Sequence, residues 1–111
     1  MVKKYIPERG DIVWLNFTPQ TGHEQMGRRP AIVISPLGYN EKVGLGLFCP
    51  ITSKEKGYPF EVIIRNKKIN GVVLSDQIKS LDWDKREIEF IIKSKKDELD
   101  EVLAKINALI K

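Results

Sequence analysis

Residues 22–35 run Gly22-His23-Glu24-Gln25-Met26-Gly27-Arg28-Arg29-Pro30-Ala31-Ile32-Val33-Ile34-Ser35 and join a polar loop directly to an apolar segment. The two glycines let the loop backbone turn freely, and Pro30 biases the residue before it toward an extended conformation. The continuous apolar run from Ala31 to Ser35 is consistent with a strand covered on both faces. The loop therefore delivers a carboxylate and two guanidiniums to the start of a buried strand, an arrangement that suits phosphodiester chemistry better than packing.

Further short apolar runs lie on both sides of this segment, and turn signals separate them. These runs are Asp11–Phe17, Gly44–Cys49, Phe60–Arg65, Gly71–Ser75, Gln77–Leu81 and Glu87–Lys93. The pair Asn70-Gly71 between apolar stretches predicts a tight turn. Seven short strands at this spacing favour a small, strongly bent barrel or sandwich over βαβ units.

The last 18 residues change period. Ser94 followed by Asp97 is typical of a helix N-cap. Beyond it, apolar residues recur at steps of three and four, which predicts an amphipathic helix that packs on the barrel or on a second copy. The apolar face is Leu99, Val102, Leu103, Ile106, Leu109 and Ile110, and the solvated face is Lys95, Lys96, Asp97, Glu98, Glu101 and Lys105. We therefore expect a mostly β protein with helices, of the α+β class, with residues 1–111 forming one domain.

The composition is that of an ordinary globular protein, with 41% hydrophobic and 31% charged residues among 111. The net charge of +4 is uneven: residues 1–80 carry a net +5, and residues 81–111 carry −1. This field would attract a polyanion or an acidic partner. The lone Cys49 excludes an intramolecular disulfide and is expected to be a buried structural thiol in a reducing compartment. We find neither a signal-peptide pattern nor a membrane-length apolar segment, so we expect a cytoplasmic protein.

The repertoire of catalytic side chains is narrow. The chain has one His and one Cys, and it has no phosphate-binding glycine loop and no cluster with metal-ligand spacing, so we expect neither a metal nor a cofactor. RNA offers another route, because its own 2′-hydroxyl can attack the adjacent phosphate. Such a reaction needs a base, stabilisation of a dianionic phosphorane and a proton for the 5′-oxygen. Arg29 suits the phosphoryl oxygens, Glu24 could be the base or orient a neighbour, and Thr52 offers a hydroxyl.

Taken singly, each of these residues has a plainer interpretation. Paired arginines are more often solvated surface charge than catalytic groups, and Thr52 with Ser53 is more often part of a turn. Trp14 and Phe17 are expected in the core, although Phe17 near the loop could stack on a base. The lysines at positions 54, 56, 67 and 68 are either a track for phosphates or solvated turn residues.

The assembled pattern resembles the MazF/PemK toxin family along essentially the whole chain, and in particular its MazF type from enteric bacteria. The motifs that carry the resemblance occur in the family's order. They are Gly10–Phe17, Gly22–Pro36, Lys56–Val62, Gly71–Ser80 and Ala104–Ile110.

The resemblance implies a sequence-specific, metal-independent endoribonuclease toxin of a type II toxin–antitoxin pair. The family adopts a small SH3-like barrel with added helices, acts as a homodimer and is held by an acidic MazE-like antitoxin. It cleaves single-stranded mRNA and leaves a 2′,3′-cyclic phosphate and a 5′-hydroxyl. Carried over by motif, the catalytic residues are Arg29, Thr52 and Glu24. The RNA-binding residues are Phe17, Gln25, Arg28, Lys56, Gln77 and Lys79.

A degenerate toxin kept for its antitoxin-binding surface is disfavoured by the presence of Glu24, Arg29 and Thr52. Two further alternatives remain at this level. One is a non-catalytic nucleic-acid-binding module of the same fold. The other is a gyrase poison that resembles the CcdB type, which relies on an aromatic residue near the C-terminus. This chain ends Ala108-Leu109-Ile110-Lys111, without an aromatic, which disfavours the gyrase poison. Arg28 stands where relatives can carry a histidine, so we expect it to affect the cleavage motif.

Overall fold

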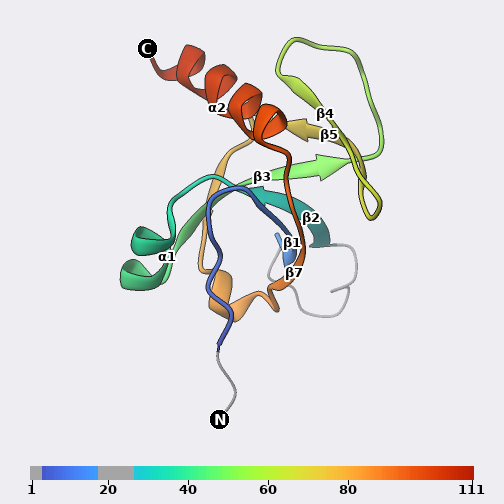
Figure 1. The fold of residues 1–111 in the computed structure, drawn as a ribbon. Coiled ribbons are helices and arrows are strands. Elements are labelled where there is room, and N and C mark those ends of the chain that lie inside the picture. The colour runs from blue at the N-terminus through green and yellow to red at the C-terminus, as the bar shows by residue number, and fades with distance from the viewer. Residues whose placement is uncertain (1–3, 18–26) are drawn as a thin grey trace.

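The computed structural model describes residues 4–17 and 27–111. Within these ranges, seven short strands and two α-helices follow one another along the chain (Figure 1). The elements are β1 (Asp11–Asn16), β2 (Arg28–Val33), α1 (Leu37–Val43), β3 (Gly46–Thr52), β4 (Glu61–Arg65), β5 (Asn70–Leu74), β6 (Lys79–Leu81), the 3₁₀ turn η2 (Trp83–Lys85), β7 (Glu89–Lys93) and α2 (Lys96–Ile110).

The strands form one strongly curled antiparallel sheet. Its order is β4-β5-β3-β2-β1-β7, and β6 pairs with β3 off this path. The strand β3 pairs with β2 along its first part and with β5 at Ile51 and Thr52, so it carries the sheet around the bend. Figure 1 shows α2 lying across the β4–β5 end of the sheet. The predicted bent, mostly β fold with a C-terminal helix is confirmed.

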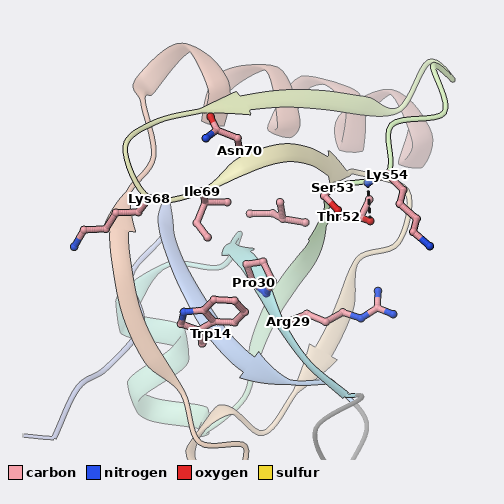
Figure 2. A pocket seen from close by; sticks show the side chains of 10 residues that line it. Trp14, Arg29, Pro30, Thr52, Ser53, Lys54, Lys68, Ile69 and Asn70 are labelled. Carbon is pink, nitrogen blue, oxygen red and sulfur yellow. Dashed lines mark hydrogen bonds between the residues drawn. The ribbon is translucent and has the colours of Figure 1, made fainter.

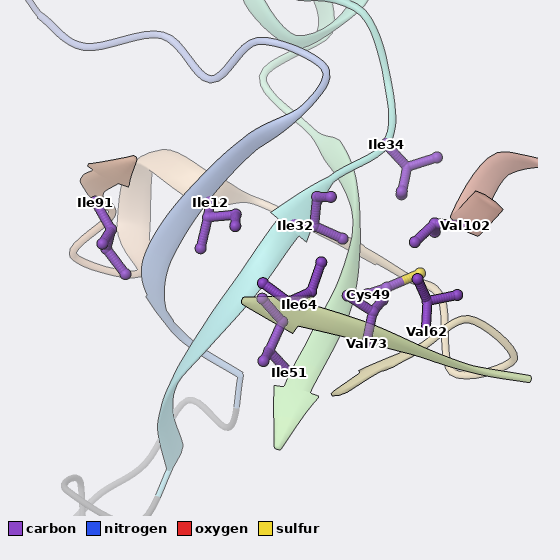
Figure 3. Close-up of a cluster of buried hydrophobic side chains, with 10 residues drawn as sticks. All are labelled: Ile12, Ile32, Ile34, Cys49, Ile51, Val62, Ile64, Val73, Ile91 and Val102. Atoms are coloured by element: carbon purple, nitrogen blue, oxygen red, sulfur yellow. The ribbon is translucent and has the colours of Figure 1, made fainter. Parts of the chain in front are cut away.

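Both faces of the central strands are buried, as the continuous apolar run predicts. Successive residues of a strand point to opposite faces, so Ile12 and Ile32 enter one core cluster while Val13 and Ala31 enter another. Figure 3 shows the first cluster, to which the helix α2 contributes Val102. Its members are Ile12, Ile32, Ile34, Cys49, Ile51, Val62, Ile64, Val73, Ile91 and Val102.

The helix α2 uses most of its predicted apolar face. Val102 is fully buried, and Leu99, Leu103 and Ile106 pack against the first cluster. At the helix end, Leu109 and Ile110 stay 46% and 77% exposed, because the sheet does not reach that far.

The start of α2 differs from the prediction in two ways. Lys95 occupies the N-cap position with no side-chain cap, and the hydroxyl of Ser94 is buried without a partner among the described residues. Glu98, expected on the solvated face, is only 9% exposed. Its Oε2 accepts a hydrogen bond of 3.0 Å from the backbone N–H of Arg65, which ties the helix to the outer strand β4.

The predicted Asn70-Gly71 turn was wrong. The chain reverses at Asn66–Ile69 instead, where the Asn66 side-chain oxygen accepts the N–H groups of Lys68 at 2.8 Å and Ile69 at 2.7 Å. The Asn66 side chain closes the turn before residue 70. Asn70 therefore lies in β5, where it pairs with Arg65 of β4. Gly71 lies within β5, where a Cβ atom would stand 2.4 Å from the carbonyl oxygen of Thr52.

The short helix α1 was not predicted, because it has no apolar face toward the core. Leu37, Tyr39 and Val43 are all 40% exposed or more. Its anchor is the buried Asn40, whose amide donates to the carbonyl oxygens of Pro7 at 2.8 Å and Ser35 at 3.1 Å. Gly44, which we had placed at the start of a strand, ends the helix with a φ of 81°.

Candidate active site

Arg28 and Arg29 are the first two residues of β2 and do not lie in the loop before it. Because neighbouring side chains of a strand alternate, they leave the sheet on opposite sides. Arg28 turns toward the β7 edge, donating to the backbone oxygen of Glu87 at 2.8 Å and to the carboxylate of Glu89 at 3.1 Å. The Arg28 side chain therefore has hydrogen-bond partners on the β7 side, whereas the Arg29 side chain lies on the opposite side of the sheet.

Strand pairing brings Arg29 and Thr52 to the same place. The β2–β3 register pairs Val33 with Phe48 and Ala31 with Pro50. Extending it by two residues places Thr52, the last residue of β3, opposite Arg29. Residues 23 positions apart in the sequence are thus brought to the same side of the sheet by the pairing of β2 with β3.

Two adjoining hollows share the side chains of Arg29, Thr52 and Lys54. The larger, of about 560 Å³, extends toward Trp14 and Asn70, and the smaller, of about 240 Å³, extends toward Tyr58 and Gln77. Figure 2 shows the larger hollow, with Arg29, Thr52 and Lys54 gathered at one end and Lys68 at the other. Arg29 and Thr52 therefore lie where two parts of one groove join.

The groove is positively charged. Its described lining contains Arg29, Lys54, Lys56 and Lys68 against one carboxylate, Glu61. That carboxylate is already occupied, since its oxygens accept the backbone N–H groups of Lys56 at 2.9 Å and of Gly57 at 2.8 Å. No ion pair within residues 4–17 and 27–111 involves the Arg29 guanidinium. Such a groove suits a chain of phosphates.

Thr52 is held with its hydroxyl at the surface of the groove. Its Oγ1 accepts the backbone N–H of Lys54 at 3.2 Å, which leaves the O–H free to donate to a bound oxygen. Behind it, Gly71 lets β5 approach the Thr52 carbonyl so closely that no other residue would fit without a shift. Local geometry on both sides therefore fixes Thr52.

The other predicted RNA contacts divide into three groups. Lys56 and Gln77 line the smaller hollow with Arg29 and Thr52. Lys79 lies elsewhere, with its ammonium 6.0 Å from the ring centre of Phe17. Phe17 is only 9% exposed and belongs to the second core cluster, so it offers little surface for base stacking. Gln25 lies outside the described residues, as does the predicted catalytic residue Glu24.

The sequence interpretation missed part of the lining. Trp14, expected in the core, is partly exposed at the larger hollow, and Asn70, expected in a turn, lines the same hollow from the start of β5. Tyr58 lines the smaller hollow, and its hydroxyl donates to Asp76 at 2.7 Å, which raises the pKa of Tyr58 to about 12. A signal for Tyr58 was present in the stretch from Lys56 to Val62, which carried part of the family resemblance.

Cys49 belongs to the core, as predicted. It is fully buried in the first cluster, and this burial raises the pKa of its thiol to about 12. Across the part of the chain that the structure covers, we find no group of three or more His, Cys, Asp or Glu side chains placed to hold a metal ion. None of the described helices is long and apolar enough to cross a membrane.

Comparison with known proteins agrees with this geometry. Residues 8–110 match the family of PemK-like, MazF-like toxins of type II toxin–antitoxin systems. The chain belongs to this toxin family. It is 46% identical over 110 residues to the endoribonuclease toxin MazF of Escherichia coli K12, with 99% of each chain covered.

The toxin also matches solved structures of the same family. A crystal structure of MazF from Deinococcus radiodurans superposes with a TM-score of 0.87 at 51% identity, covering 96% of this chain and 98% of that one. A MazE–MazF crystal structure from the same organism gives a TM-score of 0.85 at 44% identity, covering 96% and 97%. The SH3-like barrel expected from the resemblance is thereby confirmed.

Proposed function

We propose that this chain is the toxin of a type II toxin–antitoxin pair and a sequence-specific, metal-independent endoribonuclease that cleaves single-stranded mRNA. The observation that carries the proposal is the meeting of Arg29 and Thr52 at the junction of a cationic groove. Relatives that cover 99% of this chain are named endoribonucleases, which supports the same conclusion. We treat residues 1–111 as one toxin domain without a cofactor.

In the proposed reaction, the 2′-oxygen of the substrate attacks the adjacent phosphorus and the bond to the 5′-oxygen breaks. The products are a 2′,3′-cyclic phosphate and a 5′-hydroxyl. Negative charge accumulates on the phosphoryl oxygens in the transition state, where charged donors stabilise it most. The planar guanidinium of Arg29 supplies two parallel hydrogen bonds to these oxygens, and the Thr52 hydroxyl supplies another.

The proton transfers need other groups, and the departing 5′-oxygen takes its proton from water. An arginine side chain stays charged at physiological pH, so we assign Arg29 electrostatic stabilisation and not proton donation. For the base that receives the 2′-hydroxyl proton we propose Glu24, since Glu61, the described carboxylate in the groove, is engaged by two backbone N–H groups. Gln25, Lys56 and Gln77 complete the proposed RNA surface beside Arg29 and Thr52, Arg28 and Lys79 would contact the RNA only outside the two hollows, and the buried Phe17 is left out.

The positive charge of the groove also indicates what kind of partner would inhibit the toxin. We propose an acidic, MazE-like antitoxin whose extended tail lies along the cationic groove and covers Arg29 and Thr52. MazE–MazF complexes are known for the Deinococcus relative. We further propose that the toxin acts as a homodimer in the cytoplasm, where mRNA is found.

The test is cleavage of a varied single-stranded RNA pool in excess EDTA. The wild-type toxin should cleave, and Arg29→Ala and Thr52→Ala should each lose about 100-fold or more, as expected for removal of one transition-state donor. Lys42→Ala is the matched control, because it removes one positive charge from α1, away from the groove. An inactive wild type, or an Arg29→Ala variant as active as Lys42→Ala, would refute the proposal. Circular dichroism of each variant verifies that it folds.

A further inference from the structure

The segment that joins β3 to β4, residues 53–60, lies beside the smaller hollow and contributes no member to either core cluster. Residues 53–57 are all exposed. In Figure 1 the segment leaves the end of β3 as a wide green loop and returns to β4. A loop with so few buried apolar contacts depends on polar contacts for a fixed conformation. Lys56 of this segment nevertheless lines the hollow that holds Arg29 and Thr52.

Glu61, the first residue of β4, supplies polar contacts on the groove side of the segment. Its carboxylate oxygens accept the backbone N–H groups of Lys56 at 2.9 Å and Gly57 at 2.8 Å. Its own N–H donates to the carbonyl oxygen of Tyr58 at 3.2 Å. Gly57 has a φ of 83°, a conformation that favours glycine. The backbone at Lys56 is therefore held by a side chain and not by strand pairing.

Lys105 of α2 supplies polar contacts at the other end of the segment. Its ammonium donates to the carbonyl oxygen of Pro59 and, at 3.3 Å, to that of Glu61. The lysine side chain is 27% exposed, and it lines neither hollow in the described part of the chain. The helix therefore holds the point where the segment joins β4 without contributing to the groove itself.

The charge of Glu61 does not explain its place in the groove. A carboxylate among cationic side chains repels a phosphate, so its charge alone works against RNA binding. The two N–H groups that it accepts give it a different role, because they belong to the residue that adds a cation beside Arg29 and Thr52.

We propose that Glu61 and Lys105 are positioning residues for RNA cleavage, which hold residues 53–60 in the conformation that places Lys56 beside Arg29 and Thr52. Neither side chain takes part in the chemistry. The inference rests on the proposed function, because that function assigns Lys56 to the RNA surface. It gives α2 a part in RNA binding through contacts outside the groove.

The variant Glu61→Gln separates positioning from charge. Its amide offers one oxygen to two N–H donors, so the segment should loosen although the groove becomes more positive. We expect KM to rise by about 2-fold to 5-fold, the equivalent of one exposed charge pair, with kcat nearly unchanged. Glu55→Gln is the matched control, because it removes the same charge from an exposed position that lines neither hollow, and its KM should not rise. A KM for Glu61→Gln at or below that of wild type would overturn the proposal.

The contacts of Lys105 are tested in the same assay. Lys105→Met should raise KM by a similar factor, and Lys105→Arg should restore it, because a guanidinium can also donate to two carbonyl oxygens. Lys96→Met removes an exposed positive charge from the same helix and should match wild type. Equal KM values for Lys105→Met and Lys96→Met would overturn the assignment of Lys105.

A double-mutant comparison tests whether both residues act through Lys56. Lys56→Ala should raise KM by itself, and adding Glu61→Gln or Lys105→Met should then raise KM no further. Effects that multiply in the double variants would contradict the proposal, because they would show that Glu61 and Lys105 act independently of Lys56.

Amide hydrogen exchange gives a measurement that needs no RNA. The N–H groups of Lys56 and Gly57 should exchange faster in Glu61→Gln and Lys105→Met than in wild type or Glu55→Gln. If wild type cleaves RNA but these exchange rates do not change, the positioning role is wrong while the proposed function stands. If wild type does not cleave, the proposed function fails, and the exchange rates still decide whether Glu61 and Lys105 hold the segment.

Discussion

Thr52 stands opposite Arg29 when the antiparallel register of β2 and β3 is extended by two residues beyond the pair of Ala31 and Pro50. Both side chains line both hollows of the groove. The guanidinium of Arg29 and the hydroxyl of Thr52 are therefore positioned by paired strands and not by a loop. A preorganised pair of this kind is what stabilisation of a charged transition state requires.

The shape of the Arg29 side chain should matter as much as its charge. Arg29→Lys keeps the charge but loses the planar fork that makes two parallel hydrogen bonds to a phosphoryl group. We expect kcat to fall by about 10-fold to 100-fold, the equivalent of one charged hydrogen bond, with a smaller change in KM. Steady-state cleavage of a defined RNA measures both, and a kcat equal to that of wild type would rule out two-point binding.

Gly71 should be required for both the position of Thr52 and stability. An added Cβ would lie 2.4 Å from the Thr52 carbonyl oxygen, which belongs to the backbone and can yield only if β3 and β5 move apart. We expect Gly71→Ala to lower the free energy of unfolding by about 1–3 kcal/mol, as overpacking usually does, and to lower the cleavage rate as well.

Gly38→Ala in α1 is the matched control, because an added Cβ there meets nothing within 4 Å. This variant should be neutral or stabilised by up to about 1 kcal/mol. Urea unfolding of both variants gives the comparison. Equal free energies of unfolding for Gly71→Ala and Gly38→Ala would show that β5 does not lie as close to the Thr52 carbonyl as the structure indicates.

Glu98 should stabilise the packing of α2 on β4. Its buried carboxylate accepts the backbone N–H of Arg65, and Glu98→Ala leaves that donor without its partner. The expected loss is about 1–3 kcal/mol of unfolding free energy. Glu101→Ala, one turn along the same helix, removes only an exposed pair with Lys105 at 3.6 Å, which is worth about 0.3–0.5 kcal/mol. Chemical denaturation should rank the two variants in that order, and the reverse order would contradict the contact.

The buried thiol should make the protein less stable at alkaline pH. Burial, with a smaller effect of Asp76, raises the pKa of Cys49 from an ordinary 9.0 to about 12. Between these values the unfolded chain releases a proton that the native chain keeps, so stability falls as pH rises, by about 1.4 kcal/mol per pH unit at most.

Cys49→Ala removes this ionisation, although it also leaves a small cavity. The variant should therefore be less stable than wild type near pH 8, and the difference between them should shrink as pH rises above 9. Urea titrations at several pH values measure this difference in the free energy of unfolding. A difference that stays constant from pH 8 to 11 would show that the thiol is not held neutral by the fold.

Periodicity predicted most of the architecture, because strands and an amphipathic helix leave local signals in the sequence. The run Ala31–Ser35 and the face containing Leu99 and Val102 both entered the core as expected. The helix α1 left no such signal, because its apolar side chains stay exposed and a buried asparagine anchors it. The turn at Asn66 was missed because a side chain, and not a glycine, closes it.

The site was less predictable than the fold, for a geometric reason. The sequence places Arg28 and Arg29 together, and only the start of β2 decides that they point apart. Trp14 and Asn70 are 56 positions apart and line the same hollow because the sheet is curled. Phe17 lies next to the loop in sequence, but the same alternation that exposes Trp14 directs Phe17 into the core.

The central claim is that the RNA supplies its own nucleophile at the Arg29–Thr52 junction. The most direct measurement compares a single-stranded RNA with the same RNA carrying one 2′-deoxy nucleotide at the cleaved position, both incubated with wild-type toxin in excess EDTA. The account predicts cleavage of the first to a 2′,3′-cyclic phosphate and a 5′-hydroxyl, and no cleavage of the second at that linkage. Cleavage of the deoxy-substituted linkage would contradict it.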